Sequence, residues 1–139
     1  MFQHILVPTD FSEESKRAFE IAKSIISPDS GTITLLHVIE IIADTTFEEF
    51  ESFYLQLETR AEKHLDEMAP SEKNETFTIQ KKVLYGNRVR EIVAFALDHQ
   101  VDLIILNSHK INMQDPGKGW GTISYKVGIA SQCPVMLVK

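Results

Sequence analysis

The sequence is poor in the residues that build disulfides, metal clusters and membrane spans. Only one of its 139 residues is cysteine, Cys133, so no intrachain disulfide can form and a cysteine metal cluster is excluded. No stretch approaches the roughly 20 apolar residues that a membrane-spanning helix needs. The N-terminal segment lacks the basic start of a secretory signal peptide. We therefore expect a cytoplasmic protein that does not associate with membranes.

Positive charge is also scarce. The chain has 14 lysine and arginine residues against 20 acidic residues, which gives a net charge of -6. This balance disfavours general affinity for nucleic acid or for anionic membranes. It leaves nucleotides open as ligands, because a small phosphate site needs only local backbone donors.

What the sequence does contain is an ordinary globular composition, 43% hydrophobic and 24% charged, without repeats or linkers. The length fits a single domain over residues 1–139. Strand and helix patterns alternate along the whole chain, which predicts an α/β fold with a mostly parallel sheet. The five expected strands lie near residues 4–8, 32–38, 77–83, 101–106 and 135–138. The four expected helices occupy most of the segments between them, the last near residues 122–131.

The second expected helix has the clearest periodicity. Its apolar residues recur three and four positions apart, so they should share one buried face. They are Phe47, Phe50, Tyr54, Leu57, Ala61, Leu65 and Met68. Thr46 and Glu49 stand at the spacing of a capping box at its start.

A ligand site is expected where two central strands end. In open α/β sheets, ligands bind beyond the carboxyl ends of the strands, where the strand order reverses. The first and fourth strands are the expected central pair, and the segments 8–10 and 107–121 follow them. Gly121-Thr122 opens the last helix, whose free N–H groups are suited to a phosphate. The alternative is that these residues only shape a loop and cap a helix.

Several segments resemble the universal stress protein family, and they span the whole chain in register. They are Ile5-Leu6-Val7-Pro8-Thr9-Asp10-Phe11-Ser12, Leu35-Leu36-His37-Val38, Val83 to Gly86, Asp102-Leu103-Ile104-Ile105 and the ending from Gly121 to Val138. The resemblance implies the adenine nucleotide alpha hydrolase-like fold, with helices on both faces of a sheet of order 3-2-1-4-5.

The chain departs from the glycine pattern of the family's nucleotide-binding members, which is G-x-x-G, nine residues, then G-[S/T]. Asn107 and Lys110 stand at the first two glycine positions, and ten residues separate Lys110 from Gly121-Thr122. A lysine there either strains the turn or blocks the phosphate, since glycine allows positive φ and close approach. Alternatively, its ammonium group pairs with the phosphate.

The resemblance implies a pocket for ATP or AMP, with Mg²⁺ as a companion of ATP. Asp10 would accept hydrogen bonds from the ligand, and the backbone of Val38 would meet the adenine edge. The alternatives are that Asp10 is a helix cap and that Val38 only packs in the core. The implied nucleotide-binding residues are Pro8, Thr9, Asp10, Val38, Leu106, Asn107, Lys110, Gly121, Thr122 and Ile123.

The resemblance also implies a homodimer. The last strand, Val135 to Val138, is apolar on both faces although it is terminal, and such an edge usually needs cover. A second copy pairing antiparallel would supply that cover; a loop or helix of the same chain is the alternative.

Two functions follow from these observations. The first is a nucleotide-binding stress-response regulator that reports occupancy to an unknown partner protein. The second is a homodimeric interaction module of the same fold that binds no nucleotide. No catalytic constellation stands out, so we expect no enzyme, at most very slow ATP hydrolysis. His37 ends a strand and is interpreted as structural.

Overall fold

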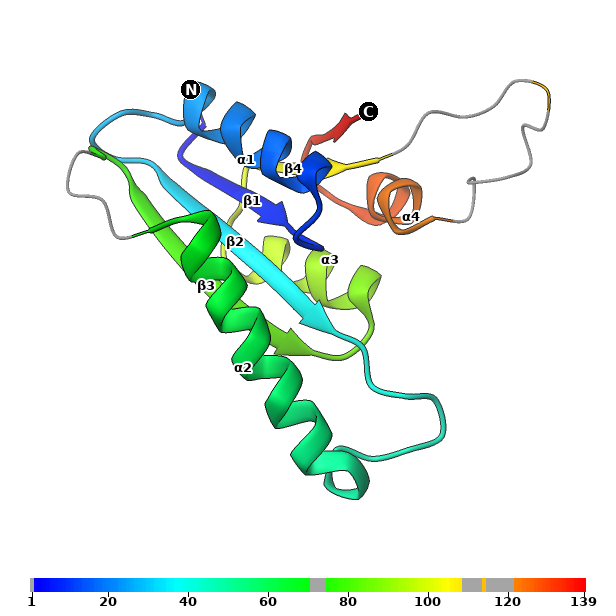
Figure 1. Ribbon diagram of the computed structural model, residues 1–139. Coiled ribbons are helices and arrows are strands. Elements are labelled where there is room, and N and C mark those ends of the chain that lie inside the picture. Colours follow the sequence, from blue (N-terminus) through cyan, green and yellow to red (C-terminus); the bar gives the residue numbers. More distant parts are fainter. Residues whose placement is uncertain (1, 71–74, 109–113, 115–121) are drawn as a thin grey trace.

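The computed structural model describes residues 2–70, 75–108, 114 and 122–139. Within these ranges, five parallel strands form one sheet of order β3-β2-β1-β4-β5, as expected (Figure 1). The strands are β1 (His4–Pro8), β2 (Thr32–Ile39), β3 (Thr78–Tyr85), β4 (Leu103–Asn107) and β5 (Val135–Val138). The helices are α1 (Glu13–Ile25), α2 (Glu51–Met68), α3 (Arg88–Asp98) and α4 (Ile123–Ala130), with a short 3₁₀ turn η1 (Glu48–Phe50) before α2.

Strands β1 and β4 are the central pair, as predicted. β1 pairs in parallel with β2 along its whole length and with β4 at Ile5 and Leu6. The chain builds outward from β1 through β2 to β3, and then crosses to the other side of β1 to form β4 and β5. The strand order therefore reverses between β1 and β4, which is where an open α/β sheet forms a ligand crevice.

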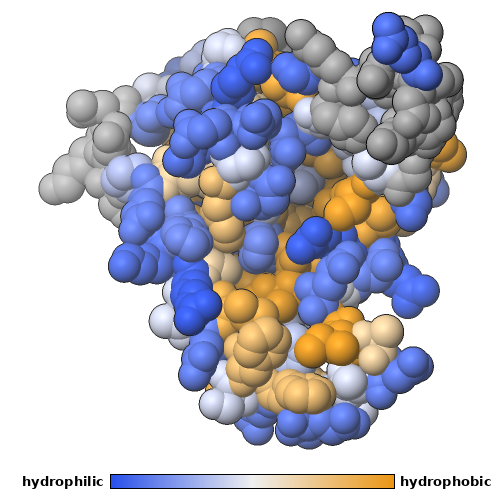
Figure 2. All heavy atoms as spheres, turned by 45° about the vertical axis from the view of Figure 1, so that its right-hand side comes forward, coloured by the Kyte–Doolittle hydropathy of each residue, from blue (hydrophilic) through white to orange (hydrophobic). Residues whose placement is uncertain are grey.

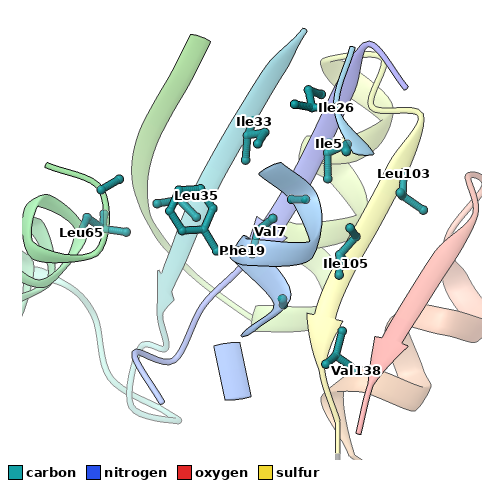
Figure 3. Close-up of a cluster of buried hydrophobic side chains, with 13 residues drawn as sticks. Ile5, Val7, Phe19, Ile26, Ile33, Leu35, Leu65, Leu103, Ile105 and Val138 are labelled. Atoms are coloured by element: carbon teal, nitrogen blue, oxygen red, sulfur yellow. The ribbon is translucent and has the colours of Figure 1, made fainter. Parts of the chain in front are cut away.

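Both faces of the sheet are covered, because side chains alternate between them along each strand. One face packs against α1 and α2, and Figure 3 shows Ile5, Val7, Leu35 and Ile105 pointing to this side around Phe19. The other face supplies Leu6, Leu36, Val38, Ile104 and Leu106 to a second core with α3 and α4. The central strands are therefore buried on both faces.

The turn after β1 assigns different roles to neighbouring polar residues. Ser12 is the N-cap of α1, since its Oγ accepts a hydrogen bond of 3.2 Å from the Ser15 N–H. Asp10 does not cap the helix; its Oδ1 accepts the Ser12 N–H at 3.0 Å. Phe11 between them adopts a left-handed conformation with φ of 67°. The carboxylate of Asp10 therefore lies at the carboxyl edge of the sheet.

The second helix begins later than its periodicity suggested. Residues 48–50 form the 3₁₀ turn and α2 starts at Glu51. Phe50 occupies the N-cap position, and its side chain makes no capping hydrogen bond. Thr46 and Glu49 form no capping box; their side chains meet at 3.4 Å ahead of the helix. Tyr54, Ala61 and Leu65 are buried as predicted, whereas Phe50 was wrongly placed on the buried face and is 41% exposed. The geometry of a 3₁₀ turn differs from that of an α-helix, so the periodicity did not extend to it.

The described helices do not include a membrane span. None of them combines the length and the apolar character that crossing a bilayer requires.

Candidate functional site

A cavity of about 110 Å³ lies beyond the carboxyl ends of β1, β2 and β4, at the reversal of strand order. Aliphatic side chains form most of its wall, with a few polar groups among them. The lining residues are Pro8, Thr9, Asp10, Leu36, His37, Val38, Arg88, Ile92, Leu106, Asn107, Ile123 and Ser124. A site of this kind, apolar with a few convergent polar groups, is typical of small-molecule binding.

A wider depression of about 610 Å³ adjoins the cavity. The two share Asp10, Asn107, Ile123 and Ser124, and the depression continues over the start of α4. Its further lining residues are polar or charged, namely Ser12, Glu14, Ser108, Thr122 and Lys139. The cavity alone is smaller than the roughly 300–1,000 Å³ typical of ligand pockets, but the two spaces together fall in that range.

Asp10 stands at the border of the two spaces and is held from two sides. Its Oδ1 accepts the Ser12 backbone N–H, and its Oδ2 accepts the Asn107 side-chain N–H at 3.4 Å. Burial raises the pKa of Asp10, but the hydrogen bonds from Ser12 and Asn107 outweigh burial and leave the pKa below its ordinary value. At neutral pH the site therefore presents an ionised acceptor that links the loop after β1 to the end of β4.

His37 lies on the wall of the cavity in a defined tautomer. Its Nδ1 is 2.8 Å from the Thr9 carbonyl oxygen, so Nδ1 carries the proton. Burial lowers the pKa of His37, and the positive charge of Arg88 lowers it further, against the opposing effect of the Thr9 hydrogen bond. The neutral ring consequently has Nε2 as an acceptor. The bond to Thr9 agrees with the structural role expected for His37, and the ring also lines the cavity.

Hydroxyl groups join the end of β4 to the start of α4. Ser108 Oγ lies 2.9 Å from Ser124 Oγ, and Thr122 Oγ1 lies 3.2 Å from the same atom. Thr122 is the N-cap of α4, with Ile123 as its first residue. Because the first N–H groups of a helix have no intrahelical acceptor, this turn offers backbone donors to an anion.

The structure brings most of the predicted site residues together. Around the cavity lie Pro8, Thr9, Asp10, Val38, Leu106, Asn107 and Ile123, and Thr122 lines the depression. Val38 also packs in the second core, which agrees with the alternative that it packs there. Lys110 and Gly121 lie outside the described residues.

Five lining residues were missed from the sequence: Leu36, His37, Arg88, Ile92 and Ser124. Leu36 carried a usable signal, because it lies two positions before Val38 and shares its face of β2. Arg88 opens α3 just after β3, at the same edge of the sheet. Its place in the cavity wall depends on how α3 packs, which local pattern does not specify.

Known proteins resemble this chain over its full length. The chain matches the Universal stress protein family over residues 1–139. It is 30% identical to Universal stress protein MJ0577 of Methanocaldococcus jannaschii, across 100% of this chain and 96% of that protein. The solved structure of MJ0577 has a TM-score of 0.83 with this chain at 29% identity, and covers 100% of this chain and 96% of that one.

Two more distant solved structures share the fold. One is a universal stress protein in complex with cAMP, with a TM-score of 0.70 and 16% identity over 99% of this chain and 97% of that chain. The other is a universal stress protein family protein of Arabidopsis thaliana with AMP bound, with a TM-score of 0.68 and 20% identity over 99% and 91% of the two chains. By its full-length match, its identity to MJ0577 and its fold, the chain belongs to the universal stress protein family.

Proposed function

We propose that this universal stress protein binds an adenine nucleotide, ATP or AMP, in the crevice beyond the carboxyl ends of β1 and β4, and that occupancy regulates a partner protein. The observation that carries the proposal is the position of Asp10. Its ionised carboxylate stands between an apolar cavity and a polar depression, held by Ser12 and Asn107. A nucleotide has the matching sequence of parts: a flat base, a sugar with hydroxyl donors, and phosphates.

Each part has a chemically suitable partner. The base would lie against the aliphatic wall of Val38, Leu106 and Ile123, with the neutral His37 Nε2 as an acceptor for an amino group. The ribose hydroxyls would donate to Asp10. The phosphates would meet the first N–H groups of α4, near Thr122.

The charges of the depression favour a metal-bound form of ATP. Asp10 and Glu14 both line it, and Lys139 is the cationic lining residue among those described. Two carboxylates close to a triphosphate are unfavourable unless a cation lies between them. Mg²⁺ prefers carboxylate and phosphate oxygens and would relieve this repulsion. We therefore expect Mg²⁺ to strengthen ATP binding and to have little effect on AMP.

Two relatives support the ligand class, since one is described in complex with cAMP and another with AMP bound. Asn107 disfavours contact between this segment and the phosphates, because it replaces a glycine of the family pattern. Its side chain turns to Asp10, however, and so completes the crevice.

The test is isothermal titration of the purified protein with ATP, ADP and AMP, with and without Mg²⁺. We expect micromolar binding of at least one nucleotide and loss of binding in Asp10→Ala. Asp98→Ala, an exposed aspartate at the end of α3, is the matched control and should bind as the parent does. Absence of binding at millimolar nucleotide would contradict the proposal and favour the interaction module without nucleotide.

We also propose a homodimer through β5. This strand is the outer strand of the sheet beside β4, and Met136 at its centre is 37% exposed. Antiparallel pairing of two β5 strands would satisfy the edge. Sedimentation should show a dimer for the parent protein and a monomer for Met136→Lys, because two lysines would meet across the two-fold axis. Leu97→Lys, an exposed position on α3, should remain dimeric.

A further inference from the structure

An apolar surface lies at the end of the molecule where β2 passes into α2. Four of its side chains are more exposed than hydrophobic residues usually are: Ile41 (36%), Ile42 (48%), Phe50 (41%) and Phe53 (47%). We call these four residues the α2-start patch. Figure 1 shows that this end of α2 projects beyond the sheet, and Figure 2 shows hydrophobic residues gathered at the same, lower end of the molecule. Clustered exposed apolar residues of this kind mark interaction sites.

The patch is ordered by contacts with a buried tyrosine. Tyr54 is fully buried, and its hydroxyl oxygen accepts the Ile42 backbone N–H at 2.7 Å. The centroid of its ring lies 5.5 Å from that of the Phe53 ring, and it stacks with the Phe47 ring at a centroid distance of 5.7 Å. A turn closes the connection, since Thr45 donates to the Ile42 carbonyl from both its N–H and its hydroxyl. Because these contacts already hold the surface in place, this chain loses little conformational freedom when a partner binds.

Acidic residues surround the patch. The segment 40–59 contains six acidic residues and no lysine or arginine, so its charge equals the net charge of -6 of the whole chain. Asp44, Glu48, Glu49 and Glu51 are exposed, and within the described residues no ion pair neutralises them. Glu40 is the exception, since its Oε1 lies 3.9 Å from the Arg88 Nε.

This charge decides which partner fits. A second copy docking through the same patch would bring two acidic rims together, and an anionic membrane would be repelled. A cationic amphipathic helix instead offers apolar residues for the rings and lysine or arginine for the rim. We propose that the α2-start patch is a docking surface for a cationic amphipathic helix of a partner protein. This inference does not depend on nucleotide binding.

A defined probe tests the proposal: a synthetic helical peptide with leucine on one face and lysine on the other, and a matched peptide with glutamate in place of lysine. Fluorescence anisotropy with the full chain should show binding of the lysine peptide that weakens with salt, and at least about tenfold weaker binding of the glutamate peptide. Phe50→Ser and Phe53→Ser should each weaken the lysine peptide about tenfold or more. The double change Glu48→Gln and Glu49→Gln should weaken it and flatten its salt dependence.

Matched controls separate the patch from general stickiness and general charge. Leu97→Ser and Ile129→Ser remove exposed apolar residues elsewhere, and the pair Glu67→Gln with Asp98→Asn removes two exposed charges elsewhere. These variants should bind as the parent does. The proposal is overturned if they lose binding as much as the patch variants, or if the two peptides bind equally. It is also overturned if Phe53→Ser abolishes self-association in sedimentation, because a second copy would then be the occupant.

Discussion

The crevice and the α2-start patch lie at the same edge of the sheet but are built in opposite ways. The crevice lies beyond the central strands, and its polar groups come from segments far apart in the chain, as in the pair Asp10 and Asn107. The patch comes from residues 41–53, which are close together in the chain. It lies where the start of α2 projects beyond the sheet.

The difference arises from the position of the strands. The strand order reverses between β1 and β4, and a concave space lies beyond their carboxyl ends. Strand β2 also has neighbours on both sides, but the chain after it leads to α2, whose start projects beyond the sheet (Figure 1). A concave space selects a small molecule, whereas a projecting surface with exposed rings selects a macromolecule.

The largest effect should come from removing the residue that supports the patch from below. Tyr54→Ala should lower the free energy of unfolding by about 3–5 kcal/mol, because it leaves a cavity and frees the Ile42 N–H. Phe53→Ala, one residue away but 47% exposed, should cost about 1 kcal/mol or less. Urea unfolding curves measure both. Equal costs for the two variants would contradict the distinction between support and surface.

The next effect separates the two regions by ligand. Ile123→Trp places bulk where the cavity meets the depression and should weaken nucleotide binding about tenfold or more. It should leave binding of the lysine peptide unchanged. Ile129→Trp, on the same helix but 86% exposed, is the control. Loss of both ligands in Ile123→Trp would mean that the regions are not independent.

A smaller effect concerns pH. The pKa of His37 is lowered in the folded protein, first by burial and then by Arg88, so below its ordinary value of about 6.5 the unfolded chain binds the proton more readily than the folded one. Stability should therefore fall as the pH drops below about 6.5, until the folded pKa is reached. His37→Gln should reduce this slope in urea unfolding curves. An unchanged slope in His37→Gln would place the pH dependence on another group.

The smallest effect concerns the ionisation of two tyrosines, which absorbance measures. Burial and the hydrogen bond to Glu58 raise the pKa of Tyr85 to about 12, whereas the bond from Lys139 lowers the pKa of Tyr125. Phenolate absorbance should show Tyr125 ionising before Tyr85 as the pH rises. Glu58→Gln should bring the Tyr85 ionisation closer to about 10, and Glu67→Gln should leave it in place. If Glu58→Gln changes nothing, Glu58 does not contribute to the raised pKa of Tyr85.

Much of the fold could be read from local pattern. The run 101–106 is apolar except for Asp102 and predicted the fourth strand, and β4 lies there as one of the central pair of the sheet. The prediction failed at Phe50, since a 3₁₀ turn precedes α2 and rotates that side chain out of the buried face. Spacing alone does not distinguish the two helix types over a single turn.

The candidate site could be predicted in part, from the positions of its residues relative to the strands. Pro8 and Asn107 end the two central strands, and Thr9 and Asp10 follow β1, so the rule for open sheets places them at the crevice. Arg88 and Ile92 reach the same cavity through the packing of α3 against the sheet. No local spacing encodes that packing, and both residues were missed.

By itself, the sequence determined the alternation of strands and helices, most of the residues that face the core, and the concentration of negative charge in residues 40–59, because these follow from residue type and spacing. Only the tertiary structure decided that Ser12 rather than Asp10 caps α1, that His37 faces a cavity, and that Ile42, Phe50 and Phe53 form one exposed surface around Tyr54. These outcomes depend on which segments meet in space, and such contacts are set by the packing of the whole chain.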